Sequence, residues 1–394
     1  RSSSERLRSC FGQGQTLPTS LGLVSPSARG ISKGALVATK SVEESPYVPD
    51  KVYHLTVLHS NDSHGHFWRD KKGQYGYSAQ KTLVDKIRRE VQGKGAQLLL
   101  LSAGDVNTGT PHSDFQDAEP DFRAMNRIGY DAMVLGNHEF DKSNAVLRKQ
   151  EEWAGLPFLA ANIYKKDSTE RAFKPYLISE HQGLKVGVIG LTTEDTATIS
   201  APDNVQDYFF RPTLKEAADM VSELRPKVGL LIALTHMGMG EKSDGHAAPG
   251  DEELAQAVGG IDVIVGGHSH TAVQEPCEIG NTLIVQADEW GKSLGRLDLT
   301  IKNGQILKHE YTLLPINQKT KVLDSDGSSK ECFTADAVCE DPELLAFLTP
   351  YYERGAASMN RVLGQAADAF QVKPIQPKGD SALGRFATKA MMER

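Results

Sequence analysis

The stretch LTVLHSNDSH at residues 55–64 is an apolar run that ends in polar residues able to bind a metal ion. Four later stretches repeat this arrangement: LLLLSAGD at 98–105, AMVLGNHEFD at 132–141, LLIALTHMG at 230–238 and VIVGGHSH at 263–270. Runs as apolar as these predict strands that are buried on both faces beneath helices. Open α/β folds place their ligands beyond the carboxyl ends of such strands. The five run ends are therefore predicted to form one site.

The side chains at the run ends are carboxylates, imidazoles and an amide, which zinc and manganese both accept as ligands. The candidates are Asp62, His64, Asp105, Asn137, His138, Asp141, His236, His268 and His270. This set is larger than one tetrahedral ion needs. Two divalent ions that share a bridging carboxylate are the more economical interpretation.

The composition of the chain limits which class of protein it belongs to and which partners it can bind. The chain has 394 residues, 39% of them hydrophobic and 24% charged, and it lacks the roughly 20 consecutive apolar residues of a transmembrane segment. These values are typical of a soluble globular protein. The net charge of -7 and the pI near 6.0 argue against a nucleic-acid polymer as partner. An anionic substrate would have to be bound by metal ions and a few local cations.

Apolar runs that alternate with helix-like stretches indicate an α/β fold. Helices are predicted over residues 78–90, 145–153, 215–224 and 251–257. Residues 282–290 and 295–316 alternate in polarity, and the Asn303–Gly304 turn predicts an antiparallel hairpin there.

The chain divides into four predicted parts. Residues 1–50, which are rich in Ser, Gly and Pro, would be a disordered extension, a targeting segment or an added tail. Residues 51–342 would form the catalytic domain. A linker helix over 343–364, with Leu344 and Leu348 on its apolar side, would precede the start of a second, truncated domain at 365–394.

Five motifs together resemble the calcineurin-like binuclear metallophosphoesterases: NDSHGHF, the GD at 104–105, GNHEFD, THMG and GGHSH. The stretches YGYSAQKTLVDKIR and QADEWGKSLGRLDL narrow the resemblance to the bacterial periplasmic 5′-nucleotidase/UDP-sugar hydrolase group, over roughly residues 52–392. The resemblance implies a four-layer α-β-β-α sandwich with two divalent ions, zinc, manganese or similar.

The family pattern also implies a role for each candidate residue. Asp62, His64 and His270 would bind the first ion, Asp105 would bridge both, Asn137, His236 and His268 would bind the second, and His138 oriented by Asp141 would be the catalytic pair. One position departs from the family, because His270 stands where its nearest members often carry Gln or Asn. This departure leaves the preferred metal open.

The implied activity is hydrolysis of 5′-nucleotides to nucleoside and phosphate, and also of UDP-sugars, by a metal-bridged hydroxide. A 2′,3′-cyclic-nucleotide phosphodiesterase or another phosphoesterase is the alternative within enzymes, and a non-catalytic metal- or nucleotide-binding fragment is the alternative outside them. The resemblance further implies a protein of the periplasm or of the cell exterior, and a monomer is expected.

Taken singly, several residues keep simpler interpretations. Asp141 could merely cap a helix through 142–148, and His59, His66, His112 and His246 could be ordinary core or surface histidines. Trp290 and Tyr75 could be packing or lid residues. Cys332 and Cys339 could close a small ring or remain two free thiols.

Overall fold

A computed structural model describes residues 47–240, 248–323, 329–360, 362, 365 and 381–392. The chain divides into two compact units, Arg1–Gly355 and Ala356–Arg394, and all five predicted strand ends belong to the first. Most of the predicted extension, the last part of the predicted linker and His246 lie outside the described residues.

The first sheet has six strands in the order β14-β13-β1-β2-β3-β4. Four neighbours run parallel: β1 (Val52–Ser60), β2 (Gln97–Ser102), β3 (Ala132–Val134) and β4 (Phe158–Leu159). Strands β13 (Ser293–Lys302) and β14 (Gln305–Pro315) form the predicted antiparallel hairpin. The turn between them has positive φ at Asn303 and Gly304, which an Asn-Gly pair tolerates best.

The second sheet also has six strands, in the order β11-β12-β10-β9-β7-β6. Its parallel centre consists of β7 (Leu184–Thr192), β9 (Leu230–His236), β10 (Val263–Gly266) and β12 (Thr282–Gln286). Strands β6 (Tyr176–His181) and β11 (Cys277–Ile279) close the edges in antiparallel pairing. The prediction that residues 282–286 share the hairpin was wrong, because β12 is buried throughout and covered on both faces.

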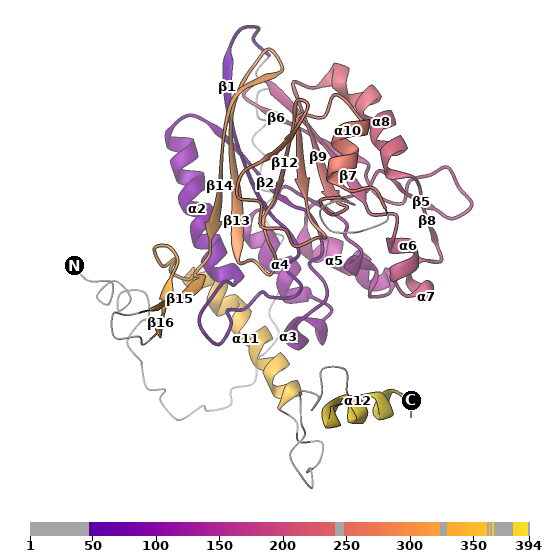
Figure 1. Cartoon of the computed structure of the whole chain (residues 1–394), viewed down its shortest axis with the longest axis vertical. Helices are drawn as coiled ribbons and strands as arrows, with labels where there is room; N and C mark the ends of the chain where they lie inside the picture. Colours follow the sequence, from indigo (N-terminus) through magenta and orange to yellow (C-terminus); the bar gives the residue numbers. More distant parts are fainter. Residues whose placement is uncertain are drawn as a thin grey trace, which may run out of the picture. The chain divides into compact units, whose positions relative to one another are not determined.

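Three hydrophobic cores define four layers. Val57 and Leu101 of the first sheet pack against Ile232 and Val265 of the second. On the outer face of the first sheet lie α2 (Tyr77–Gly93), α4 (Glu119–Ile128) and α5 (Asn144–Ala154). On the outer face of the second lie α8 (Thr213–Leu224) and α10 (Asp251–Ala257). Figure 1 shows α2 on one side of the two sheets and α8 and α10 on the other. The predicted α-β-β-α sandwich is confirmed.

The remaining elements are short connections and the C-terminal helices. They are α3 (Pro111–Asp114), η1 (His138–Phe140), β5 (Ile163–Lys165), α6 (Thr196–Ile199), α7 (Pro202–Val205), β8 (Tyr208–Phe210), η2 (Arg225–Lys227), β15 (Lys319–Leu323), β16 (Ser329–Phe333), α11 (Pro342–Met359) and α12 (Ala382–Met392). Helix α11 buries Leu344 and Leu348 in the first core, as its apolar side predicts. In the part of the chain that is described, no helix combines the length and apolarity needed to cross a bilayer.

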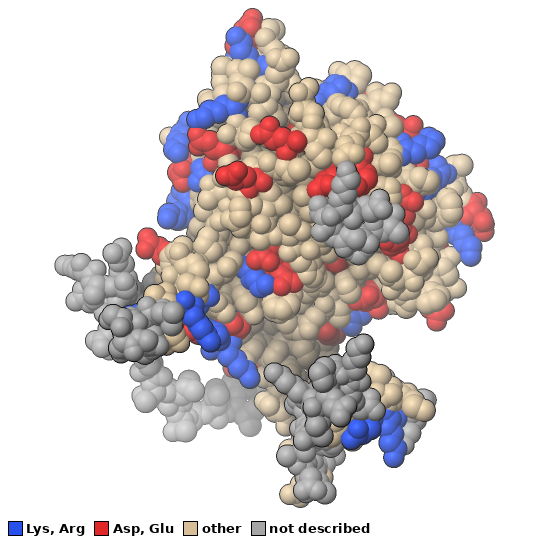
Figure 2. All heavy atoms as spheres, in the orientation of Figure 1, with Lys and Arg blue, Asp and Glu red and all other residues tan. Residues whose placement is uncertain are grey.

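Two features of the surface bear on the sequence predictions. Cys332 is a free thiol, so the structure contains no Cys332–Cys339 bridge. Figure 2 shows Lys and Arg side chains interspersed with Asp and Glu side chains over the described residues of one face. The net charge of -7 is therefore not gathered into a single patch on that face.

Candidate metal centre

Most of the predicted ligands lie in tight turns just beyond the strands. Five of them have a positive φ: Asp62 (51°), His64 (46°), Asp105 (52°), His268 (83°) and His270 (54°). The left-handed region costs a residue other than glycine about 1–3 kcal/mol, and such residues gather at functional sites. The turns after β1, β2 and β10 therefore hold these side chains in place at an energetic cost.

Backbone hydrogen bonds and glycines join neighbouring turns. The amide of Asp62 donates to the carbonyl of Gly104 (2.9 Å), and the amide of His64 donates to the carbonyl of Asp105 (3.1 Å). A Cβ atom on Gly136 would lie 2.1 Å from Oδ1 of Asp105, and Gly104 has a φ of +86°. Glycine is needed at both positions because the turns approach each other so closely.

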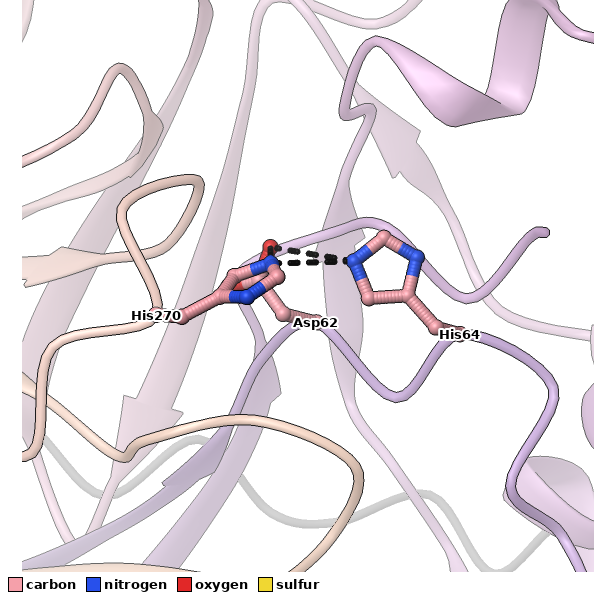
Figure 3. A group of neighbouring side chains, drawn as sticks. All are labelled: Asp62, His64 and His270. Carbon is pink, nitrogen blue, oxygen red and sulfur yellow. Dashed lines mark hydrogen bonds and ion pairs between the residues drawn. The ribbon is translucent and has the colours of Figure 1, made fainter. Parts of the chain in front are cut away.

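Asp62, His64 and His270 form the first group of candidate ligands. Oδ1 of Asp62 lies 3.4 Å from Nε2 of His270 and 3.9 Å from Nε2 of His64. The two Nε2 atoms lie 3.0 Å apart. Figure 3 shows the Asp62 carboxylate and both rings turned toward one small volume.

The hydrogen bonds behind these rings determine which nitrogen faces that volume. Nδ1 of His64 lies 3.0 Å from the carbonyl oxygen of Thr108, and Nδ1 of His270 lies 2.6 Å from Oε2 of Glu289. Because both partners accept hydrogen bonds, each Nδ1 carries the proton. Neutral rings would then point two Nε2 lone pairs at each other over 3.0 Å, which a cation between them would stabilise. This set of donors fits a divalent ion.

The second group of candidate ligands consists of Asp105, His236 and His268, and the motifs imply Asn137 as a fourth member. Nε2 of His236 lies 3.0 Å from Oδ2 of Asp105, while its Nδ1 donates to the carbonyl of Ala103 (2.6 Å). Ligand atoms of Asp105, His236 and His268 lie within 4.8 Å of one another. The buried Oδ1 of Asn137 has no hydrogen-bond partner among the described residues. A buried amide oxygen normally has one, so this atom also fits a metal ligand.

Asp105 connects the two groups. Its ligand atoms lie within 4.8 Å of His236 and His268 in one set and of His64 and His138 in another. A carboxylate with two oxygens in this position is able to bridge two ions.

The electrostatic field of the centre favours cations. Burial of His236 opposes its protonation, but Asp105 and Asp62 outweigh burial and raise the pKa of this imidazole to about 10. The hydrogen bond to Asp62 likewise raises the pKa of His270. Burial opposes ionisation of Asp105, yet the imidazoles of His236, His138 and His64 hold its pKa below the usual range. The potential that attracts these protons would equally attract metal ions.

His138 and Asp141 lie beside this centre. Nδ1 of His138 is 2.7 Å from Oδ2 of Asp141, which also accepts a hydrogen bond from Oγ1 of Thr108 (2.5 Å). The hydrogen bond to Asp141 raises the pKa of His138 to about 9. Helix α5 has Ser143 as its N-cap, so the interpretation of Asp141 as a mere helix cap was wrong. The pair is about one third exposed, at 38% and 32%, and accessible to a substrate.

The other histidines and the aromatic residues mostly contribute to packing. His59 is fully buried, and burial lowers its pKa to about 3. The ring of His66 stacks on Trp290 at 4.7 Å and meets Tyr75 edge-on at 5.6 Å. The ring of His112 stacks on Tyr352 at 4.7 Å.

Sequence reasoning missed the role of Glu139, although this residue is part of the GNHEFD motif. The side chain is fully buried. Oε2 accepts from the amides of Asp105 (3.0 Å) and Gly136 (2.8 Å), and Oε1 accepts from those of Val106 (2.9 Å) and Asn107 (3.2 Å). Burial, reinforced by Asp105, raises the pKa of Glu139 to about 7. One side chain thus holds the turn after β2 against the turn after β3.

We expect Glu139→Gln to destabilise the metal-free protein by roughly 3–5 kcal/mol. The amide nitrogen would replace one acceptor oxygen and would face two backbone N–H donors. Denaturant unfolding measures this change, with the partly exposed Glu151→Gln on α5 as the control, for which a loss below about 1 kcal/mol is expected. If the two variants lost the same amount of stability, Glu139 would not be the residue that holds the two turns together.

Comparison with known proteins identifies the family. The model of the calcineurin-like phosphoesterase family matches residues 55–272, more than half of the chain. The chain belongs to this family. The match encloses all nine predicted site residues, from Asp62 to His270. A member of this family is a metal-dependent hydrolase, and the structure contains groups of side chains that could hold a divalent ion.

Relatives and solved structures support the same assignment. The chain is 46% identical to Protein UshA of Yersinia enterocolitica, over 88% of this chain and 67% of the relative. It is 47% identical to a 5′-nucleotidase of Vibrio vulnificus, over 91% of this chain and 68% of the relative. The crystal structure of a 5′-nucleotidase precursor from Thermus thermophilus has a TM-score of 0.67 and 29% identity, covering 86% of this chain and 67% of that one.

Proposed function

We propose that this chain hydrolyses 5′-nucleotides to nucleoside and phosphate at a centre of two divalent ions. The observation that carries the proposal is the convergence of two ligand groups beside the His138–Asp141 pair. Relatives named 5′-nucleotidase, at 44–47% identity, support a nucleotide as the substrate. UDP-sugars are proposed as further substrates on the resemblance of the motifs alone.

Each ligand keeps the role that the motifs imply. In this proposal Asp62, His64 and His270 would hold one ion, Asn137, His236 and His268 would hold the other, and Asp105 would be shared by both. Asn137 contributes a neutral oxygen, which limits the negative charge around the ions and keeps them strong Lewis acids. Zinc and manganese both suit such a mixture of nitrogen and oxygen ligands.

The ions, when bound, would activate a water molecule and neutralise charge on the phosphoryl oxygens. The chain's own contribution beyond ligation comes from His138. Its Nδ1 is bonded to Asp141, so Nε2 is free to face the phosphoryl group. In its protonated form His138 can donate a hydrogen bond to that group or give its Nε2 proton to the leaving oxygen. Asp141 fixes the orientation of the ring and stabilises its positive charge.

Removal of metal should abolish phosphate release from AMP, and addition of Mn²⁺ or Zn²⁺ should restore it, because every proposed step depends on the ions. The measurement combines metal analysis with a substrate panel of AMP, UDP-glucose, a 2′,3′-cyclic nucleotide and p-nitrophenyl phosphate. Circular dichroism of the metal-free protein serves as the control for folding.

The panel also separates the alternatives. A preference for the cyclic nucleotide would favour a phosphodiesterase. Two bound ions without hydrolysis of any ester would favour a non-catalytic binding fragment. Full activity in protein that carries no metal would contradict the proposal itself.

We further propose a monomer that acts in the periplasm or outside the cell, and a second domain that begins after the linker helix, near residue 365. These proposals rest on the resemblance of the motifs. Cell fractionation and sedimentation analysis test the first, and limited proteolysis near residue 365 tests the second.

A further inference from the structure

We propose that Glu289 is a positioning residue that prepares His270 as a metal ligand and thereby sets the affinity of the first ligand group. The inference rests on the proposed metal centre and not on the proposed substrate. Glu289 lies in the loop between β12 and β13, 19 positions beyond His270 in the sequence.

The carboxylate of Glu289 is engaged on both sides. Oε2 lies 2.6 Å from Nδ1 of His270, and Oε1 lies 2.6 Å from Nζ of Lys292. The side chain is 18% exposed. Lys292 also lies over the ring of Trp290, 4.5 Å from its centroid. One oxygen of Glu289 therefore pairs with Lys292, and the other accepts a hydrogen bond from the imidazole of His270.

This contact has a specific chemical consequence for His270. An acceptor on Nδ1 places the proton there and leaves Nε2 as the atom that faces Asp62 and His64. A carboxylate that accepts this bond also increases the basicity of the ligand nitrogen. Side chains that orient a metal-binding histidine in this way commonly contribute about 10–100-fold to metal affinity.

Among the three ligands of the first group, His270 is the one whose orientation depends on a carboxylate. The side chains of Asp62 and His64 are 0% and 9% exposed, whereas that of His270 is 35% exposed. His64 is oriented by the backbone carbonyl of Thr108 (3.0 Å). The more exposed ring, on a turn with a φ of 54°, therefore depends on Glu289 to keep one orientation.

The loop that carries Glu289 is itself fastened to the turn after β1. The side chain of Asn61 accepts from the amide of Ala287 (2.8 Å) and donates to the carbonyl of Asp288 (2.5 Å). The amide of Trp290 donates to the carbonyl of Asp62 (2.7 Å). The loop thus contacts Asp62 through its backbone and His270 through Glu289, and so fixes two ligands of one ion relative to each other.

The test is a titration of metal-free protein with Mn²⁺, with free Mn²⁺ followed by electron paramagnetic resonance. For Glu289→Ala we expect one of two binding steps to weaken about 10–100-fold and the other to change little. In Glu289→Gln the amide oxygen can still accept from Nδ1, so we expect a smaller loss. The melting temperature of each metal-free variant checks its fold, and the Gln variant keeps the test decisive if the Ala variant is unstable.

A double-mutant cycle separates positioning from a general effect on the loop. If Glu289 acts through His270, Glu289→Ala should cost little further affinity once His270→Gln is present. The matched control is Glu278→Ala, since Glu278 also pairs with a histidine, His309 at 3.4 Å, and affinity should not change. Additive losses in the cycle, or wild-type affinity in Glu289→Ala, would overturn the inference. A wild-type protein that binds no Mn²⁺ would overturn the metal centre, and this inference with it.

Discussion

Asp105→Asn is expected to lower the rate of phosphate release from AMP by roughly 10³- to 10⁵-fold, equivalent to about 4–7 kcal/mol of lost transition-state stabilisation. The amide of the variant can still accept from the backbone amide of His138, as Oδ1 does now at 2.9 Å. Its nitrogen, however, would replace Oδ2, which lies 3.0 Å from Nε2 of His236. A carboxylate that serves both ligand groups would become an amide with one oxygen and no charge.

The measurement pairs the steady-state rate with metal content by mass spectrometry. We expect the variant to keep its fold and to bind fewer than two ions per chain. The control is Asp219→Asn on α8, an exposed carboxylate paired with Lys215, for which rate and metal content should match the wild type. A variant at position 105 with wild-type rate would exclude Asp105 as the bridging ligand and would remove the basis for two coupled ions.

The convergence of the candidate ligands could be predicted from the sequence, because their placement follows from strand topology. Parallel strands bring their carboxyl ends to one edge, so Asp62 after β1 and Asp105 after β2 had to be neighbours. His236 and His268 are brought together in the same way by β9 and β10, which are also parallel. The hairpin was equally predictable, because Asn303 and Gly304 tolerate the positive φ that the turn requires.

The supporting residues could not be predicted, because their partners are set by packing across loops. Glu289 and His270 lie on different loops, and no regular spacing of a helix or strand links the two residues in the sequence. Glu139 is part of a motif, yet three of its four backbone partners lie about 30 residues away, in the turn after β2. Asp141 differs from these residues, because the GNHEFD motif already implied that it orients His138, and its Oδ2 lies 2.7 Å from Nδ1 of that ring. Strand β12 was assigned to the wrong sheet because a short apolar run does not reveal which neighbours will cover it.

His138→Asn is expected to lower the turnover number about 10²- to 10⁴-fold, the usual contribution of a general acid, while both ions remain bound. Its backbone amide bond to Asp105 would persist, so the ligand groups should keep their arrangement. The measurement is the turnover number with AMP at saturating Mn²⁺, together with metal content. A loss below about tenfold would show that His138 neither donates to the leaving oxygen nor stabilises the transition state.

The pH dependence distinguishes a general acid from a residue that merely packs beside the ions. The hydrogen bond to Asp141 is the largest cause of the raised pKa of His138, which is about 9. Protonated His138 is the form that donates, so turnover should fall as pH rises through its pKa. Asp141→Asn removes the charge that favours the protonated form and should move this alkaline fall about 1–2 pH units lower. The same profile measured for Asp219→Asn should coincide with the wild type. An alkaline limb that stays in place in Asp141→Asn would assign the fall in rate to another group and would leave His138 without a role in proton transfer.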